Sequence, residues 1–367
     1  MIKFLDLKST NQQYRSELIS ACTRVIDSGW YVCGKELEAF ERSFSEYCNA
    51  DYCVGVANGL DALSLTLRSW IEIGKLQKGD EVLVPANTFI ASVFAITEND
   101  LIPVLIEPDP LTFNMSTESL VAAITDKSRV IMPVHLYGQM ADMPKIMTIA
   151  KKYQLLVLED AAQAQGASIA EVKAGAWGDA AAFSFYPGKV LGALGDAGAV
   201  TSNDELLVQT LRALRSYGSD TKYEHRYVGA NSRLDEIQAA MLSIKLAYLD
   251  NDIERRQTIA ARYLDGIKHS SIQLPKCKQH QQHSWHLFVL RCNQRDKLQQ
   301  QLTLAGIETL VHYPIPIHQQ SAYASFNHKS FPITEKIQSE VLSVPIGPCL
   351  QDQDVDNIIQ TLNGVDL

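Results

Sequence analysis

A lysine and an aspartate, each placed at or just after an apolar run, are the side chains of this sequence best suited to chemistry. Asp160 closes the segment VLED, and Lys189 follows it in a turn rich in Gly, Pro and small residues. Apolar and backbone groups that crowd a lysine remove its water, which lowers the pKa of the amine and makes it nucleophilic. Such an amine can form an imine with an aldehyde, whereas a lone loop lysine is ordinarily a solvated cation.

Together the two side chains match what pyridoxal phosphate (PLP) requires. Its aldehyde must be held as a lysine imine, and an aspartate keeps its ring nitrogen protonated so that the ring withdraws electrons. At the ends of two strands, Asp160 and Lys189 can reach opposite ends of one planar ring. Gln163, close behind Asp160 in the sequence, can reach the ring hydroxyl with its amide. Helix capping or plain exposure is the ordinary alternative for this glutamine.

The PLP phosphate needs hydrogen-bond donors, which the segment GVANGLDALSLTL (residues 55–67) offers. Its pattern predicts a strand, a glycine turn and a helix start, so the backbone N–H groups of Gly59 and Leu60 would point at an anion. Ser184, at the end of another strand, can add its hydroxyl, and Phe89 in VPANTFIAS can stack on the ring. The ordinary alternatives are a simple Asn-Gly connector and an aromatic packed in the core.

These residues need a scaffold in which the carboxyl ends of several strands meet. Between residues 50 and 200, apolar β-rich runs alternate with helical stretches, which predicts βαβ units and a mostly parallel central sheet. An open α/β sheet binds its ligands beyond the carboxyl ends of its strands. We expect strands at residues 52–57, 81–85, 102–106, 129–134, 155–158 and 180–185, and helices at 36–47, 61–73 and 143–153.

The pattern changes in the last third of the chain, which predicts two domains. We expect residues 1–250 to form a large PLP-binding α/β domain with an N-terminal helical segment, and residues 251–367 to form a small C-terminal α+β domain. One long helix over residues 234–263, stopped at Gly266, would link them. The second domain would contain a strand at 285–290 and a helix at 295–304.

Composition excludes several other classes of protein. The chain of 367 residues has a formal net charge of -9 and no dense Lys/Arg stripe, which argues against a nucleic-acid partner. Its longest uncharged stretch, residues 82–97, is shorter than the about 20 apolar residues that span a bilayer, and the N-terminus is too polar for a signal peptide. Seven scattered cysteines without a CxxC pair argue against a zinc site and favour a reducing cytoplasm. His280 and His283, in a Gln-rich loop, indicate solvated surface rather than a metal site.

Six segments, in this order, resemble the sugar-nucleotide aminotransferases of the DegT/StrS type, which are PLP enzymes of the aspartate aminotransferase fold (fold type I). They are NGLDAL, PANTFIAS, PVHLYGQMADM, LEDAAQAQGA, SFYPGKVLGALGDAGA and GANSRLDEIQAAML, and the resemblance runs from FLDLKSTN to HYPIPIH. It implies the imine with PLP at Lys189, the ring-nitrogen partner at Asp160, and the residue near the ring hydroxyl at Gln163. The remaining matches place the phosphate at Ser184 and at the backbone of Gly59 and Leu60, and the aromatic over the ring at Phe89.

The same resemblance implies contacts with a substrate and with a second subunit. Asn231 matches a residue that the neighbouring subunit lends to the phosphate, which implies a homodimer with two shared sites; capping of the long helix is its alternative. Tyr186 and the pair His312 and Tyr313 match contacts with the hexose. Lys222 matches a lysine that reaches the nucleotide diphosphate or sugar from the second subunit. A polar-loop cation and a packing histidine are the alternatives for Lys222 and His312.

The implied reaction is a ping-pong transamination in the cytoplasm. L-Glutamate would give its amino group to the 3-keto group of a dTDP-3-keto-6-deoxyhexose through pyridoxamine phosphate, yielding 2-oxoglutarate and a dTDP-3-amino-3,6-dideoxyhexose for a polysaccharide or natural product. One alternative is the same chemistry at carbon 4 of a UDP- or dTDP-4-keto sugar. Another is a non-catalytic regulatory or binding protein on the same fold. A sugar dehydratase is disfavoured, because related dehydratases carry His where this chain has Lys189.

Overall fold

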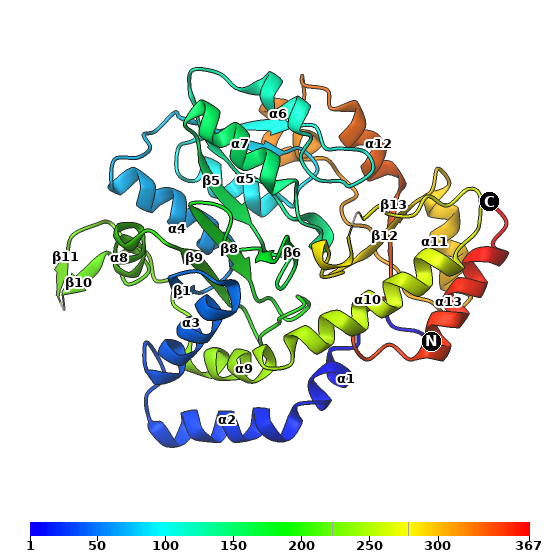
Figure 1. Cartoon of the computed structure of the whole chain (residues 1–367), viewed down its shortest axis with the longest axis horizontal. Coiled ribbons are helices and arrows are strands. Elements are labelled where there is room, and N and C mark those ends of the chain that lie inside the picture. Colours follow the sequence, from blue (N-terminus) through cyan, green and yellow to red (C-terminus); the bar gives the residue numbers. More distant parts are fainter. Residues whose placement is uncertain (222, 278) are drawn as a thin grey trace.

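A mostly parallel sheet lies at the centre of the computed structural model, which describes residues 1–221, 223–277 and 279–367 (Figure 1). Within these residues, seven strands follow the order β1-β9-β8-β5-β4-β2-β3. Neighbours from β8 to β3 are parallel, whereas β9 is antiparallel to both β8 and β1. The strands are β1 (Tyr52–Val56), β2 (Glu81–Pro85), β3 (Ile102–Ile106), β4 (Ser128–Ile131), β5 (Leu156–Asp160), β8 (Ala180–Ser184) and β9 (Gly198–Ser202). This sheet confirms the predicted α/β class.

Helices cover both faces of the sheet, because successive side chains of each strand point to opposite sides. In β8, Ala181 and Phe183 join one apolar layer, while Ala180 and Ala182 join the other. The first layer is completed by α3 (Lys35–Cys48), α6 (Thr117–Ala123), α7 (Met143–Tyr153) and α9 (Glu236–Leu246), and the second by α4 (Gly59–Glu72), α5 (Ile90–Thr97) and α8 (Glu205–Leu214). Burial on both faces explains the nearly continuous apolar runs in the sequence.

Strand β9 is the element of the sheet that the sequence analysis omitted. Its residues are small and follow a glycine-rich turn, so they carry little of the β-branched and aromatic signal that marks a strand. All five are nevertheless buried, and they pair with β8 on one side and β1 on the other. A Cβ at Gly198 would overlap the carbonyl oxygen of Asn58, so this close packing requires glycine.

The predicted long helix over residues 234–263 is wrong, because two helices occupy this region. Helix α9 begins only at Glu236 and ends at Leu246, and α10 (Leu249–Gly266) starts after a break at Ala247 and Tyr248. Asp250 and Asp252 lie in the first turn of α10, where carboxylates favour a helix start. Figure 1 shows α9 beneath the sheet and α10 running away from it toward the C-terminal helices.

The C-terminal part has its own apolar core around Tyr263, Trp285 and Phe288. Its antiparallel strands β12 (Phe288–Arg291) and β13 (Val341–Val344) pack with α11 (Arg295–Leu304), α12 (Pro332–Glu340) and α13 (Asp352–Gly364). The observed strand starts three positions after the predicted 285–290, while α11 has the predicted bounds. Helix α10 runs through residue 250 without a loop, and the division at that residue stays a prediction.

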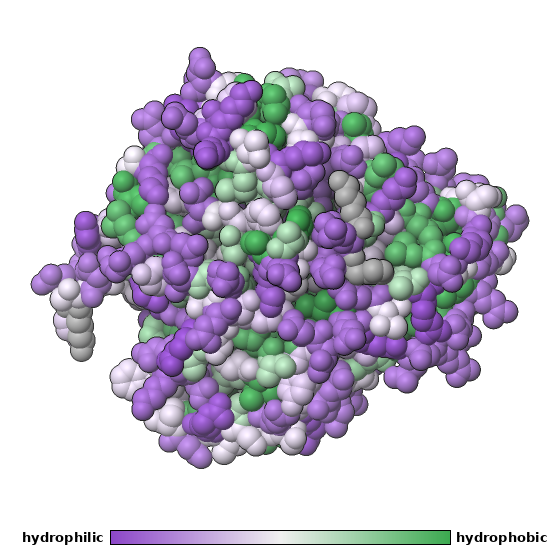
Figure 2. Space-filling view, in the orientation of Figure 1, coloured by the Kyte–Doolittle hydropathy of each residue, from purple (hydrophilic) through white to green (hydrophobic). Residues whose placement is uncertain are grey.

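The remaining elements are short or peripheral. Helix α2 packs outside α9, as Figure 1 shows. These elements are α1 (Leu7–Gln12), α2 (Arg15–Ser28), β6 (Ser168–Ile169), β7 (Val172–Lys173), β10 (Ser219–Thr221), β11 (Glu224–His225), η1 (Leu136–Gly138), η2 (His280–Gln282), η3 (Ile317–Gln319) and η4 (Ser321–Phe326). Most of the face in Figure 2 is hydrophilic, with apolar groups in separate small patches. Among the described residues, no helix combines the length and apolar character needed to cross a membrane.

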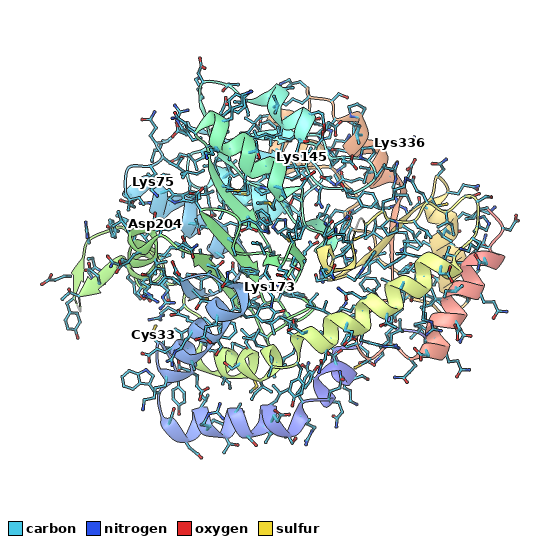
Figure 3. The ribbon with its side chains drawn as sticks, in the orientation of Figure 1. Cys33, Lys75, Lys145, Lys173, Asp204 and Lys336 are labelled. Atoms are coloured by element: carbon cyan, nitrogen blue, oxygen red, sulfur yellow. The ribbon has the colours of Figure 1, made fainter. Side chains whose placement is uncertain are left out.

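Two ion pairs, one buried and one partly exposed, connect the helices near β1. Arg215, just after α8, lies 2.6 Å from Glu41 of α3, and both side chains are at most 10% exposed. The Glu41 carboxylate also accepts a hydrogen bond from the backbone N–H of Gly55 in β1. Lys75, after α4, pairs at 2.7 Å with Asp204, the N-cap of α8, and both are partly exposed (Figure 3). The buried pair therefore holds the strand that leads into the predicted phosphate turn.

Candidate active site

A cavity of about 830 Å³ lies beyond the carboxyl ends of the central strands and gathers most of the predicted site residues. It is bounded by the turns after β1, β2, β5 and β8 and by segments of the C-terminal part. Ten of the twelve predicted residues line it: Gly59, Leu60, Phe89, Asp160, Gln163, Ser184, Tyr186, Lys189, His312 and Tyr313. The meeting of strand ends therefore places these side chains together, as the topology of a parallel sheet requires.

Lys189 lies in the turn between β8 and β9, and its backbone N–H donates to the carbonyl of Tyr186. Desolvation lowers the pKa of its amine to about 8, and the Asp160 carboxylate partly opposes this shift. A lysine with this pKa is neutral in a large fraction at mildly alkaline pH, when an ordinary lysine is almost entirely charged. The site therefore provides the nucleophilic amine that an imine requires.

The pKa of Lys189 predicts how the cofactor-free protein captures PLP at different pH. Only the neutral amine attacks an aldehyde, so the capture rate should rise about tenfold per pH unit below the pKa and level off near pH 8. An amine with an ordinary pKa would keep gaining rate beyond pH 10. Stopped-flow absorbance of PLP mixed with cofactor-free protein between pH 6 and 10 measures this profile. A rate that still climbs tenfold per unit at the top of that range would contradict the shift.

Asp160 ends β5 with its carboxylate buried and hydrogen-bonded. Desolvation raises the pKa of this carboxyl, but two donors favour its charged form. The hydroxyl of Ser92 donates to Oδ2 at 2.7 Å, and the backbone N–H of Ala162 donates to Oδ1 at 3.2 Å. A carboxylate has about four acceptor positions. The contacts from these two residues leave capacity for a further donor such as a protonated ring nitrogen.

The start of α4 and the end of β8 form a pocket of donors suited to a phosphate. Asn58 caps α4 by accepting from the backbone N–H of Asp61 at 2.8 Å. A Cβ at Gly59 would lie 2.6 Å from the Cβ of Ser184, so only glycine lets the helix start approach this serine so closely. Gln165 donates to the Ser184 carbonyl at 2.7 Å and fixes the strand end. The donor set and the glycine contact fit the phosphate of PLP.

Aromatic side chains line the wall of the cavity near Gln163. Phe89 is 50% exposed, and its ring centroid lies 5.1 Å from that of Tyr313. The Gln163 amide accepts from the backbone N–H of Tyr137 at 2.6 Å and donates to the Tyr313 hydroxyl at 3.0 Å. Burial, with a smaller effect from Lys189, lowers the pKa of His312 to about 4, so this imidazole is neutral. The wall thus offers a flat apolar face and oriented neutral donors.

Of the predicted residues that the structure describes, Asn231 alone does not line this cavity. Asn231 is exposed and forms an isolated β-bridge with Ser216. The alternative role of Asn231, as the N-cap of the helix that follows it, is wrong, because Asp235 is the N-cap residue of α9. Lys222 lies outside the described residues.

The expectation of solvated surface is wrong for His283. Its side chain is 3% exposed and stacks on Trp285, with ring centroids 3.7 Å apart. Burial lowers the pKa of His283 to about 3, and its Nδ1 accepts from the backbone N–H of Trp285. In the described part of the chain, no group of three or more His, Cys, Asp or Glu side chains is arranged to hold a metal ion.

Sequence reasoning missed several side chains of the cavity. Ser92 contacts Asp160, and Thr88 contacts Ser92; their one-turn spacing in PANTFIAS was the available signal. His286 also lines the cavity. Burial and then the charge of Lys189 lower the pKa of this histidine well below its usual value. Its place within the predicted strand at 285–290 carried no sign of a site, and neither did that of Phe4 near the N-terminus.

Comparison with known proteins accords with this geometry. The DegT/DnrJ/EryC1/StrS aminotransferase family matches residues 12–363. A relative from Aneurinibacillus thermoaerophilus, described as a dTDP-3-amino-3,6-dideoxy-alpha-D-galactopyranose transaminase, is 52% identical over 99% of both chains.

Two solved structures are similar over nearly the whole chain. S. venezuelae DesV, in complex with a ketimine intermediate, has a TM-score of 0.95 and 44% identity, covering 99% of this chain and 97% of that one. NtdA from Bacillus subtilis, with bound cofactor PMP, has a TM-score of 0.91 and 29% identity, covering 98% and 83%. These likenesses confirm the aspartate aminotransferase fold and PLP as the cofactor. The chain therefore belongs to the DegT/DnrJ/EryC1/StrS aminotransferase family and is a PLP-dependent enzyme.

Proposed function

We propose that this enzyme transfers the amino group of L-glutamate to the 3-keto group of a dTDP-3-keto-6-deoxyhexose, giving a dTDP-3-amino-3,6-dideoxyhexose and 2-oxoglutarate. The observation that carries the proposal is the joint placement of Lys189, Asp160 and the phosphate pocket in one cavity. The relative that is 52% identical over 99% of both chains is described as a transaminase for a 3-amino-3,6-dideoxy sugar. This similarity favours carbon 3 over carbon 4.

The cavity supplies what a bound PLP needs. When bound, PLP provides an electron sink for negative charge at the amino-acid α-carbon. Asp160 would present an anionic oxygen to the ring nitrogen, and the Ser184 hydroxyl and the N–H groups at the start of α4 would donate to the phosphate. Phe89 would offer its exposed ring to one face of the cofactor. These roles are proposed from the donors, burial and exposed faces described above.

Lys189 moves the proton in both half-reactions. Its Nζ accepts the proton from the α-carbon of glutamate and later delivers one to carbon 3 of the sugar. A base with a pKa near the operating pH combines the right protonation state with sufficient driving force. The neutral His312 and the hydroxyls of Tyr186 and Tyr313 suit the hydroxyl groups of a hexose, which carries no charge.

The diphosphate of the nucleotide requires cations that one subunit does not supply. Among the described residues that line the cavity, Lys189 is the only Lys or Arg. We therefore propose a homodimer in which Lys222 and Asn231 reach the neighbouring cavity. The exposure of Asn231 outside its own cavity supports this arrangement. The seven free cysteines support a reducing cytoplasm as the place of action.

Mixed dimers test the shared site. Lys189→Ala and the double variant Lys222→Ala/Asn231→Ala should each be nearly inactive alone. Random mixing by co-expression should restore about a quarter of wild-type activity per chain, because half of the dimers are mixed and each has one intact site. The recovered activity should scale with the fraction of mixed dimers separated by two affinity tags. No recovery in purified mixed dimers would mean that each site is built from one chain.

The visible spectrum tests the reaction itself. PLP added to the protein should give a yellow band, glutamate should bleach it, and a dTDP-3-keto-6-deoxyhexose should restore it. Restoration by a 4-keto sugar alone would move the reaction to carbon 4. A band that glutamate does not bleach would refute the proposed amino donor.

A further inference from the structure

Two buried hydroxyl groups form a hydrogen-bonded chain that ends on Asp160. The Ser92 hydroxyl lies 2.7 Å from Oδ2 of Asp160, and the Thr88 hydroxyl lies 2.8 Å from that of Ser92. Thr88 and Ser92 are 2% and 1% exposed, so both hydroxyl contacts are shielded from bulk water. Phe89, between them in sequence, is the N-cap residue of α5. One helical start therefore carries both the aromatic face and the hydroxyls that reach Asp160.

The direction of the chain follows from the number of protons. Ser92 has one hydroxyl proton, and an ionised Asp160 can only accept. The Ser92 proton therefore goes to Asp160, and the Ser92 oxygen is left to accept from Thr88. Since Thr88 also lines the cavity, the chain runs from the cavity wall to the carboxylate. Thr88 thus holds the Ser92 hydroxyl in its donating orientation.

We propose that Ser92 is a positioning residue that keeps a shared proton on the ring nitrogen of PLP instead of on Asp160, and that Thr88 orients it for this task. The inference rests on the proposed pairing of Asp160 with the ring nitrogen. A hydrogen bond donated to a carboxylate draws electron density from it and weakens its hold on a proton. The proton between Asp160 and the ring nitrogen then stays on nitrogen, where it strengthens the electron sink.

Burial makes this contact necessary. Desolvation raises the pKa of Asp160, and the hydrogen bonds from Ser92 and Ala162 oppose that shift. Electrostatic interactions with Lys189 and His135 also oppose the rise, and the Asp160 charge in turn helps to raise the pKa of Tyr313. The Ala162 contact is longer, at 3.2 Å, than the Ser92 contact at 2.7 Å. Loss of Ser92 would therefore leave the carboxylate with its weaker donor alone.

The protonation of the ring nitrogen can be measured directly. Wild-type protein and the variants Ser92→Ala, Ser92→Thr and Thr88→Val would be loaded with PLP labelled with ¹⁵N in the ring. We expect the ¹⁵N resonance of Ser92→Ala to move toward that of neutral pyridine, and that of Ser92→Thr to stay at the wild-type position. Thr88→Val should lie between them, because its Ser92 hydroxyl can turn away. The glutamate half-reaction should slow about 10- to 100-fold in Ser92→Ala, as expected for loss of a charge-assisted hydrogen bond.

Two controls separate this role from a merely structural one. Ser69 of α4 is also fully buried, and its hydroxyl has no hydrogen-bond partner among the described residues. Ser69→Ala should leave the resonance and the half-reaction unchanged. In an Asp160→Asn background, Ser92→Ala should add little, because the two residues act through one contact.

The possible outcomes distinguish this inference from the proposed site. An unchanged resonance in Ser92→Ala, with PLP bound as in wild type, would overturn the role of Ser92 and leave the site intact. A resonance that moves equally in Ser69→Ala would overturn it as well. A neutral ring nitrogen in wild type, together with no effect of Asp160→Asn, would instead refute the pairing of Asp160 with the ring.

Discussion

Lys189→Ala is expected to abolish transamination, with kcat for the overall reaction falling by about 1,000-fold or more. The substitution removes both the amine that holds the cofactor and the base that moves the proton. PLP should still bind through the phosphate pocket and the Asp160 contact, but without the absorption band of the lysine imine. Absorbance spectra and single-turnover assays with glutamate measure the two losses separately.

Chemical rescue makes this prediction specific to the amine. A small amine such as methylamine can enter the space of the missing side chain and act as the base, so it should restore part of the half-reaction. Lys145 of α7, an exposed lysine that pairs with Asp142 at 3.1 Å, provides a matched control (Figure 3). Lys145→Ala should keep full activity and show no response to methylamine. Retained activity in Lys189→Ala without added amine would refute its role.

Glu41→Gln is expected to lower the free energy of unfolding by about 3–5 kcal/mol, because it leaves the buried charge of Arg215 without its partner. Glutamine keeps the size of the side chain but removes the charge that lies 2.6 Å from the guanidinium. It also weakens the contact with the backbone of Gly55 in β1. Urea unfolding of the PLP-loaded protein, followed by circular dichroism, measures the change in midpoint and slope.

The partly exposed pair of Lys75 and Asp204 gives the comparison. Both pairs lie at ends of α8, but water screens this second pair, so Lys75→Ala should change the free energy of unfolding by only about 0–1 kcal/mol. Equal effects of Glu41→Gln and Lys75→Ala would show that burial does not determine the contribution of the pair. A loss of PLP affinity in Glu41→Gln alone would connect β1 to the phosphate pocket.

The sequence predicted the parallel core because its signals are local and agree with one another. Apolar runs such as Glu81–Pro85 and the helix Met143–Tyr153 have the predicted bounds, and the strand ends bring ten predicted residues into one cavity. Their individual roles stay predictions. Strand β9 was missed because its small residues are ordered by pairing with two neighbours, which are distant in sequence.

Other features depended on tertiary contacts that residue types do not reveal. The break at Ala247 and Tyr248 divides a helical pattern whose propensity continues through it; α9 packs in the core beneath the large sheet, whereas the second half of α10 packs in the C-terminal core. His283 has polar neighbours in sequence but stacks on Trp285 in the folded chain. The contact of Ser92 with Asp160 joins helix α5 to the end of β5, which are far apart in sequence, so it becomes visible only when the sheet is assembled.

The antiparallel direction of β9 has a consequence for the freedom of Lys189. Ser184 and Gly198 pair directly across β8 and β9, so the turn that carries Lys189 leaves the sheet and returns to the adjacent strand. Bringing the ends of a loop together lowers its conformational entropy. Pairing of β8 with β9 already fixes both ends of this turn in the absence of cofactor. The turn that carries Lys189 is therefore anchored at both ends by the paired strands. Residues within it can change to suit a different substrate while the anchor points, and with them the reach of the amine, remain in place.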